Sequence, residues 1–285
     1  MKKLIGDNFC EIPKYKLYRK VGEIIHPTIS KKNISNYKVI FDDKLLPVLV
    51  FYPKKVSNID SVIIYVTGDG KVSGSYAKYA DVCKKIAMEC NKLVIAIDYF
   101  SGSIKYPTTI NKVYKILKYL YEELPTNGIV RDNITLMGDS TGCKILGGVV
   151  SRLCNNNIYF DKMIFFYPVV RNDYSDYGWD QKCLTVNYGL DKKVERYLKS
   201  FFSKSEAFDC DLLLSESLSD FPKTLIVTGD MDILKGDGKL LAERFIDEIF
   251  GSKYCNVDFV GHGFLNSADE GIGKTIYNEI NEFVI

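Results

Sequence analysis

The sequence Leu-Met-Gly-Asp-Ser-Thr-Gly-Cys, residues 136–143, contains the pattern G-x-S-x-G. It follows a short apolar run, residues 134–137, that is typical of a buried strand, and it leads into residues 143–153, whose apolar positions have helical spacing. A strand, a sharp turn and a helix in this order place the serine at a strained corner, with its hydroxyl exposed above a sheet. The pattern therefore predicts a reactive hydroxyl on Ser140. The pentapeptide alone leaves open an ordinary serine in a glycine-rich turn.

Strand-like and helix-like runs alternate along most of the chain. Apolar runs typical of buried parallel strands lie at residues 61–66, 93–97, 134–137, 163–167, 223–228 and 257–260. Helical spacing of apolar residues is found at residues 76–90, 107–121, 143–153, 193–202, 239–250 and 270–283. This alternation predicts an α/β fold, with a mostly parallel sheet that is covered by helices on both faces.

Two parts of the chain, residues 1–52 and 171–220, depart from this alternation. Residues 36–41 and 46–52 are β-type runs separated by a short polar segment, which predicts an antiparallel hairpin and hence a mixed sheet. Residues 1–34 have no clear period, although the spacing of their apolar residues predicts a short helix. The polar and aromatic stretch 171–220 interrupts the alternation, and we expect it to lie over the carboxyl ends of the strands, where such sheets bind ligands. Because no stretch of the sequence has the composition of a linker between domains, we expect a single domain, residues 1–285.

A serine nucleophile needs a base, and the base needs a carboxylate that orients it. His262 follows the last predicted strand and is one of only two histidines, so it is the candidate base. The other, His26, precedes a proline, and we interpret it as structural or exposed. The acid should follow the preceding strand, where both Asp230 and Asp232 are found. Spacing alone does not separate these two aspartates.

Composition excludes several classes of protein. The chain has 38 basic and 36 acidic residues, a net charge of +2, whereas a dedicated nucleic-acid binder shows a clear basic excess. The longest apolar runs are far too short to span a membrane. Residues 1–8 lack an apolar run of secretory length, so we expect no signal peptide and a cytoplasmic location. The eight cysteines, which have no metal-type pairing, are then expected to be reduced thiols.

Three motifs together make the chain resemble the α/β-hydrolase fold, and within it the hormone-sensitive-lipase-like esterases. That family has G-D-S-A-G at its nucleophile, and residues 138–142 read G-D-S-T-G. It has G-x-x-D-x-L at its acid, which Gly229, Asp232 and Leu234 match, and H-G-F at its base, which residues 262–264 match. The order serine, acid, histidine is also that of α/β-hydrolases. Each motif is weak alone, and the resemblance covers roughly residues 36 to 285.

The resemblance implies a fold and a set of roles. It implies an eight-stranded core sheet and a small cap formed by residues from about 1–35 and 171–220. On the motif match, Asp232 is the acid and Asp230 its neighbour. The implied activity is hydrolysis of carboxylic esters of small soluble molecules through an acyl-enzyme, with no metal or organic cofactor. The oligomeric state does not follow from the sequence.

The chain departs from the family at the loop that supplies backbone donors for the oxyanion. The family has H-G-G-G there, whereas residues 67–70 read T-G-D-G, and Thr141 replaces the alanine after the nucleophile. Lys112 also stands where an acidic residue is usual. We expect the N–H groups of Thr141, Gly70 and Asp69 to hold the oxyanion.

The stretch 171–220, called the insertion below, contains aromatic residues that suit a substrate pocket. Tyr174, Tyr177 and Trp179, the only tryptophan, either line this pocket from the cap or pack the cap onto the core. Two other functions stay open: a catalytically weak or silent relative that binds a small ligand under its cap, and an amidase or peptidase of the same fold.

The charge of Asp69 gives a first testable prediction. A carboxylate about 5 Å from a developing oxyanion costs roughly 3 kcal/mol at an effective dielectric constant of about 20. Asp69→Gly should therefore raise kcat on neutral p-nitrophenyl esters about ten-fold or more. A loss of activity on the same esters would show instead that Asp69 supports the loop or positions a donor.

Overall fold

The computed structural model describes residues 17–20, 34–41, 44–53, 59–68, 76–97, 99, 108–126, 128–171, 174, 211–266 and 270–285. The predicted helix at residues 193–202 and most of both expected cap elements lie outside these ranges. Within them, no helix combines the length and the apolar character needed to cross a membrane.

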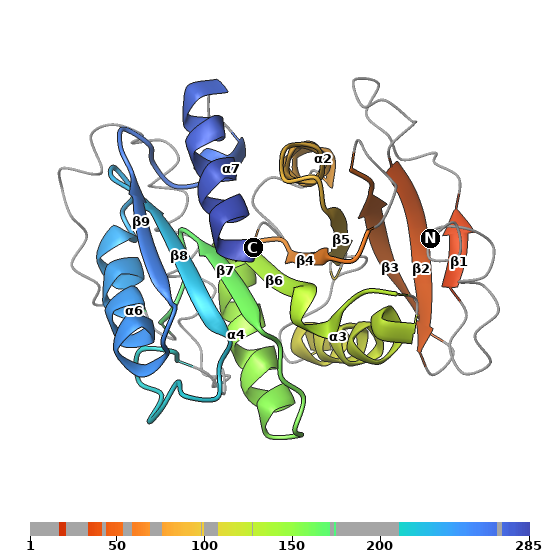
Figure 1. Ribbon diagram of the computed structural model, residues 1–285. Helices are drawn as coiled ribbons and strands as arrows, with labels where there is room; N and C mark the ends of the chain where they lie inside the picture. Colours follow the sequence, from red (N-terminus) through yellow and green to blue (C-terminus); the bar gives the residue numbers. More distant parts are fainter. Residues whose placement is uncertain are drawn as a thin grey trace.

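A nine-stranded mixed sheet organises the described residues (Figure 1), in the order β1-β2-β3-β5-β4-β6-β7-β8-β9. All pairings from β5 to β9 are parallel, whereas the β1-β2, β2-β3 and β3-β5 pairings are antiparallel. This confirms the mixed, mostly parallel sheet and adds one strand to the expected eight. The strands are β1 (Leu17–Lys20), β2 (Ile34–Phe41), β3 (Lys44–Phe51), β4 (Val62–Val66), β5 (Leu93–Ile97), β6 (Ile134–Asp139), β7 (Lys162–Phe166), β8 (Lys223–Gly229) and β9 (Lys253–Val257).

Helices cover the two faces of the sheet, so its central strands are apolar on both sides. Helices α2 and α7 lie on one face, and α3, α4 and α6 lie on the other (Figure 1). In β4, Val62, Ile64 and Val66 belong to the core under α3, α4 and α6, while Ile63 and Tyr65 belong to the core under α2 and α7. The helices are α2 (Tyr76–Glu89), α3 (Thr108–Thr126), α4 (Thr141–Cys154), α6 (Lys235–Glu248) and α7 (Glu270–Val284), with short 3-10 helices at Arg131–Asn133 and Phe264–Asn266.

Two predicted elements differ from the structure. Residues 17–20 form β1 rather than part of a helix, because the hairpin of β2 and β3 offers a free edge with which this backbone pairs. The last strand is β9 at Lys253–Val257, not residues 257–260. An edge strand needs few apolar side chains, so its pattern is weak. Phe259, which suggested a strand, is 87% exposed and has a φ of 60°.

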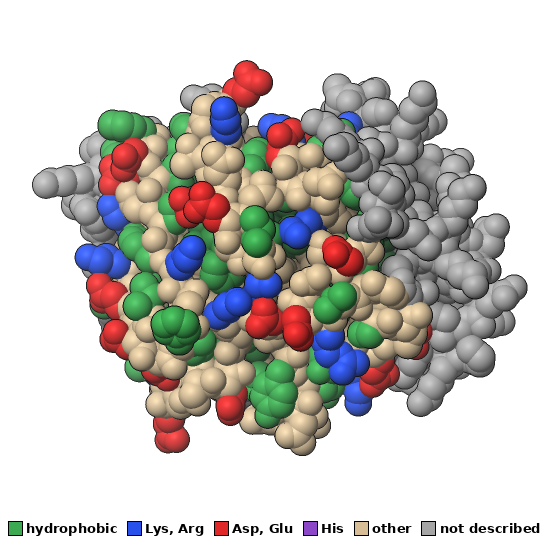
Figure 2. Space-filling model, in the orientation of Figure 1, with side chains coloured by type: hydrophobic (Ala, Val, Ile, Leu, Met, Phe, Trp, Pro, Cys, Tyr) green, Lys and Arg blue, Asp and Glu red, His purple; other side chains and the backbone are tan. Residues whose placement is uncertain are grey.

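Charged side chains of both signs are scattered over the described part of one face of the molecule (Figure 2). On the face shown in Figure 2, basic and acidic side chains of the described residues are interspersed rather than gathered by sign. This mixing agrees with the small net charge of the chain.

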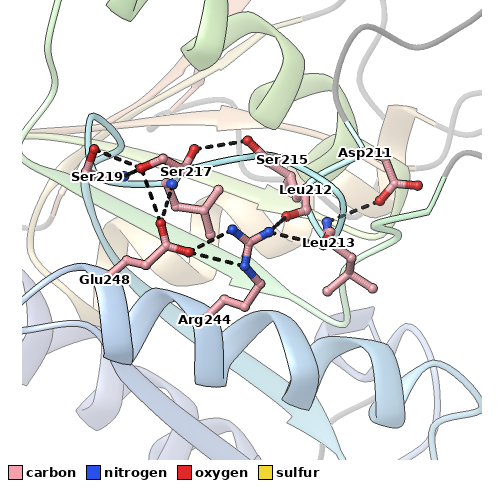
Figure 3. A network of polar contacts seen from close by, with 9 residues as sticks. Asp211, Leu212, Leu213, Ser215, Ser217, Ser219, Arg244 and Glu248 are labelled. Atoms are coloured by element: carbon pink, nitrogen blue, oxygen red, sulfur yellow. Dashed lines mark hydrogen bonds and ion pairs between the residues drawn. The ribbon is translucent and has the colours of Figure 1, made fainter.

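A polar network fastens the segment before β8 to α6 (Figure 3). The guanidinium of Arg244 donates to the carbonyl oxygens of Leu212 and Leu213 at 2.9 and 3.1 Å, and it pairs with Glu248 at 2.7 Å. Glu248 also accepts the backbone N–H of Leu218. Leu212 itself is fully buried against α4, where a Cβ on Gly147 would lie 2.8 Å from it. The return of the chain from the insertion is therefore fixed by both α4 and α6.

The pKa of Glu248 gives a prediction for stability. The Leu218 N–H, opposed by partial burial and helped by Arg244, holds this pKa below its usual value. The contacts of the ionised Glu248 carboxylate with Leu218 and Arg244 therefore stabilise the fold at pH values above the unfolded-state pKa. This stabilisation is lost as the pH falls through the lower folded-state pKa. Glu248→Gln should lower the free energy of unfolding by about 1 kcal/mol or less at pH 7. The difference should shrink as the pH falls through the folded-state pKa.

The matched control is Glu243→Gln on the same helix. Glu243 is 55% exposed and lies 3.8 Å from Lys239, so its loss should change little at either pH. Equal effects of the two variants, measured by urea unfolding at pH 7 and pH 3.5, would contradict the role assigned to the network.

Candidate active site

Ser140 lies at the sharp corner between β6 and α4. Its φ and ψ are 49° and −121°, a conformation that a residue with a side chain rarely adopts. Its N–H donates to the carbonyl of Phe166 at 2.9 Å, and its own carbonyl accepts the N–H of Val169 at 3.1 Å. The last residue of β7 and the chain that follows it therefore hold both sides of the corner. This is the strained strand-to-helix turn that the sequence predicts.

Glycine is required at the corner because backbones meet there without side chains between them. A Cβ on Gly142 would lie 2.2 Å from the carbonyl oxygen of Val66, at the end of β4. A Cβ on Gly138 would lie 2.9 Å from a side-chain carbon of Leu146. The two glycines of G-x-S-x-G thus let α4 approach both β4 and β6.

The structure brings Ser140, His262 and Asp232 together. The hydroxyl oxygen of Ser140 lies 3.0 Å from Nε2 of His262. Nδ1 of the same imidazole lies 3.1 Å from each carboxylate oxygen of Asp232. His262 and Asp232 are 6% and 1% exposed, so water has little access to either.

Backbone contacts hold the loops that carry the acid and the base. The N–H of Met231 donates to the carbonyl of Val260 at 2.9 Å, and a Cβ on Gly229 would lie 2.4 Å from that same oxygen. The carboxylate of Asp232 also accepts the N–H of Leu234 at 2.8 Å, which fixes its direction. The loops after β8 and β9 are therefore packed together, and their two functional side chains meet.

The two candidate aspartates are separated by their surroundings. Asp230 is bonded to Lys235 at 2.7 Å and its side chain is 37% exposed, so it forms an ion pair near the surface. Asp232 is the one that contacts the imidazole. His26, Asp69 and Gly70 lie outside the described residues.

Asp139, the residue directly before the serine, has a structural role that the sequence motif did not predict. Asp139 is 2% exposed, and its Oδ1 accepts both the hydroxyl of Tyr65 and the N–H of Gly68, each at 2.8 Å. The hydroxyl of Thr141 donates to the carbonyl oxygen of Gly68. The two residues that flank Ser140 therefore both contact the start of the predicted oxyanion loop.

Tyr167, at the end of β7, was also missed. Its ring lies edge-on to the imidazole of His262, with 4.9 Å between centroids, and 4.8 Å from the ring of Phe264. It is 1% exposed and has a φ of 35°, which is strained for an aromatic residue. Burial raises the pKa of its hydroxyl well above the ordinary value. The Tyr-Pro pair that ends the strand was the available signal.

Tyr174, the one described member of the three aromatic candidates, is fully buried. Its hydroxyl accepts the N–H groups of Val170 and Arg171, at 3.0 and 3.2 Å. Arg171 in turn pairs with Asp237 of α6 at 2.8 Å, and burial raises the pKa of this carboxyl against the effect of Arg171. Tyr177 and Trp179 lie outside the described residues. The start of the insertion is thus fastened to α6, as its end is.

The arrangement has the chemistry of an activated hydroxyl. A hydrogen-bonded imidazole can accept the proton of Ser140, and a buried carboxylate can hold the imidazole with Nδ1 protonated. Across the described part of the chain, no group of three or more His, Cys, Asp or Glu side chains is placed to hold a metal ion.

Comparison with known proteins identifies the family of the chain. Residues 63–266 match a family described as alpha/beta hydrolase fold. An arylesterase of Saccharolobus solfataricus is 21% identical over 273 residues, which cover 91% of this chain and 88% of that protein. Carboxylesterase NlhH of Mycobacterium tuberculosis is 23% identical over 233 residues, which cover 78% and 72%.

Solved structures share the architecture. The esterase of the archaeon Pyrobaculum calidifontis superimposes with a TM-score of 0.73 at 18% identity, covering 89% of this chain and 83% of that one. A solved arylesterase has a TM-score of 0.72 at 20% identity, covering 88% and 85%. At these identities the likeness establishes the fold.

The hydroxyl of Tyr167 gives a prediction. Among the described residues, no atom shares a hydrogen bond with it, and an unpaired buried polar group costs about 1–3 kcal/mol. Tyr167→Phe should therefore raise the free energy of unfolding by about 1 kcal/mol, as measured in urea, since the ring contact with His262 is kept. Tyr167→Leu, which loses the ring, should lower it by about 1–3 kcal/mol. Destabilisation by the phenylalanine variant would show that the hydroxyl has a partner.

Proposed function

Because the chain belongs to the alpha/beta hydrolase fold family, we propose that it is a serine hydrolase that cleaves carboxylic esters of small soluble molecules. One observation carries the proposal: the unbroken hydrogen-bond chain from the Ser140 hydroxyl through His262 to Asp232. The relatives named arylesterase and carboxylesterase support the choice of an ester as substrate.

The proposed reaction has two halves, joined by an acyl-enzyme. In the first, Ser140 Oγ attacks the ester carbonyl carbon while His262 Nε2 takes the hydroxyl proton. The tetrahedral intermediate then breaks its bond to the alcohol oxygen, which receives that proton from the imidazole. In the second, water attacks the acyl-serine, His262 takes the water's proton and returns it to Ser140, and the carboxylic acid leaves.

Asp232 has an orienting role in this scheme. Its carboxylate accepts Nδ1–H, which leaves Nε2 free to accept the serine proton, and it stabilises the imidazolium that forms. The proposed oxyanion donors are the N–H groups of Thr141, Gly70 and Asp69. The last two lie outside the described residues. The reaction as written uses no metal or organic cofactor.

The substrate range rests on the resemblance. By resemblance to the family, we propose soluble esters with about two to six acyl carbons. Tyr177 and Trp179 are proposed to line the pocket from the cap, and the cytoplasm is the proposed location. Faster turnover of emulsified long-chain triglyceride than of dissolved butyrate esters would contradict this range.

A second function is favoured by one departure from the family. Residues 67–70 read T-G-D-G where the family has H-G-G-G, so a weakly active or silent protein that binds a ligand under its cap is the alternative. Labelling by a fluorophosphonate probe separates the two, since only an activated serine reacts. Modification at Ser140, absent in Ser140→Ala, would support a hydrolase. Comparing p-nitrophenyl esters with matching anilides then distinguishes an esterase from an amidase.

The two neighbouring aspartates provide a matched pair of variants. Asp232→Asn should lower kcat by roughly 10⁴-fold, because the amide leaves the imidazole in the wrong tautomer. Asp230→Asn breaks only the ion pair with Lys235 near the surface, so kcat should stay within about two-fold. Steady-state rates on p-nitrophenyl butyrate measure both. The reverse ranking would mean that Asp230 is the acid.

A further inference from the structure

The turn at Thr67 and Gly68 leads from β4 into the predicted oxyanion loop, and it is held from the nucleophile corner. Strands β4 and β6 are neighbours in the sheet, with Val66 paired to Gly138, so this turn and the corner leave the sheet side by side. A Cβ on Gly68 would lie 2.1 Å from the carbonyl oxygen of Asp139 and 2.8 Å from Cβ of Ser140. The turn therefore lies directly against the serine.

Three hydrogen bonds fix this turn. The N–H of Gly68 donates to Asp139 Oδ1 at 2.8 Å, and the hydroxyl of Thr141 donates to the carbonyl of the same glycine. The hydroxyl of Tyr99 donates to the carbonyl of Thr67. The three side chains that make these bonds are buried: Asp139, Thr141 and Tyr99 are each at most 7% exposed. Both polar groups of Gly68 are therefore held by the residues on either side of Ser140.

The Thr141 bond depends on a residue that departs from the family motif. The family's G-D-S-A-G has an alanine after the nucleophile, which carries no hydroxyl, and its loop reads H-G-G-G rather than T-G-D-G. The hydroxyl of Thr141 bonds to the carbonyl of Gly68, a glycine that the family shares and that lies between the two departing residues, Thr67 and Asp69. A hydroxyl at residue 141 thus does for this loop what an alanine is unable to do.

We propose that Thr141 is a positioning residue. Its hydroxyl holds the Gly68 carbonyl and so positions the oxyanion loop relative to Ser140. The proposal rests on the proposed function. A peptide unit is planar, so a bond that holds its carbonyl oxygen also limits rotation of the whole unit. Oxyanion donors work only within about 2.7–3.1 Å of the developing charge, and loss of one costs about 10²–10³ in kcat. A loosened loop should lose part of this factor.

The test compares variants that keep or remove the hydroxyl. Thr141→Val has nearly the same shape without the hydroxyl, and it should lower kcat on p-nitrophenyl butyrate about 10- to 100-fold, with KM within about two-fold. Thr141→Ser keeps a hydroxyl and should retain most of kcat. The inhibition constant of a trifluoromethyl ketone, which forms a tetrahedral adduct with the serine, should rise in Thr141→Val in proportion to the fall in kcat/KM.

Thr224→Val is the matched control. Its hydroxyl also donates to a backbone carbonyl, that of Pro222, at 2.7 Å in a fully buried position. It lies at the opposite end of β8 from the loop that carries Asp232, so its loss should lower the unfolding temperature but not kcat. This control separates positioning from general stability.

The outcomes are distinguishable. The proposal is supported if Thr141→Val loses kcat and inhibitor affinity together while Thr141→Ser and Thr224→Val retain kcat. It is overturned if Thr141→Val keeps the wild-type kcat, or if Thr141→Ser loses as much as Thr141→Val. If the valine variant fails to fold, Thr141→Ala provides the same comparison. Failure of the wild-type protein to turn over esters or to react with a fluorophosphonate overturns the proposed function itself.

Discussion

The close approach of three backbones around Ser140 is the constraint on which the rest of the structure depends. The serine has a positive φ, and such a conformation persists only where the surroundings over-determine it. Bonds to Phe166 and Val169 hold it from β7, and Gly68 and Gly142 let β4 and α4 come within contact. A side chain at either glycine would force these elements apart. The same packing that strains the serine therefore fixes where every neighbouring loop begins.

Parallel strands explain why residues so distant in sequence meet. The carboxyl ends of β4, β6, β7, β8 and β9 lie at one edge of the sheet, so the loops after them converge there. Ser140 follows β6, Asp232 follows β8 and His262 follows β9, at separations of 122 residues for Ser140 and His262 and 30 for His262 and Asp232. Each loop needs to be positioned only relative to its neighbours for the hydrogen-bond chain to form.

The sequence predicted those parts of the molecule that depend on pattern. The alternation of apolar runs predicted the central strands β4 to β8 and the five α-helices of the described residues, and G-x-S-x-G predicted the corner at Ser140. Spacing alone did not separate Asp230 from Asp232, which lie two residues apart, because only the turn after Gly229 decides which carboxylate faces inward. The match to G-x-x-D-x-L was needed to choose Asp232. Tyr167 and Asp139 were missed because each reads as the ordinary end of a strand, and their contacts come from neighbouring strands. The strand β1 was missed because it forms by pairing with the hairpin edge rather than by its own pattern.

Helix α6, which begins just after Asp232, also holds the chain at both ends of the insertion. Asp237 holds Arg171 at the start of the insertion, and Arg244 and Glu248 hold residues 212–218 at its end. The chain is therefore attached to α6 both before and after residues 175–210. These attachments fix the positions at which that segment begins and ends. The entropic cost of closing a loop grows only slowly with its length. Changes of length between these two anchoring points should therefore cost the fold little and should leave the serine, the imidazole and the carboxylate in place.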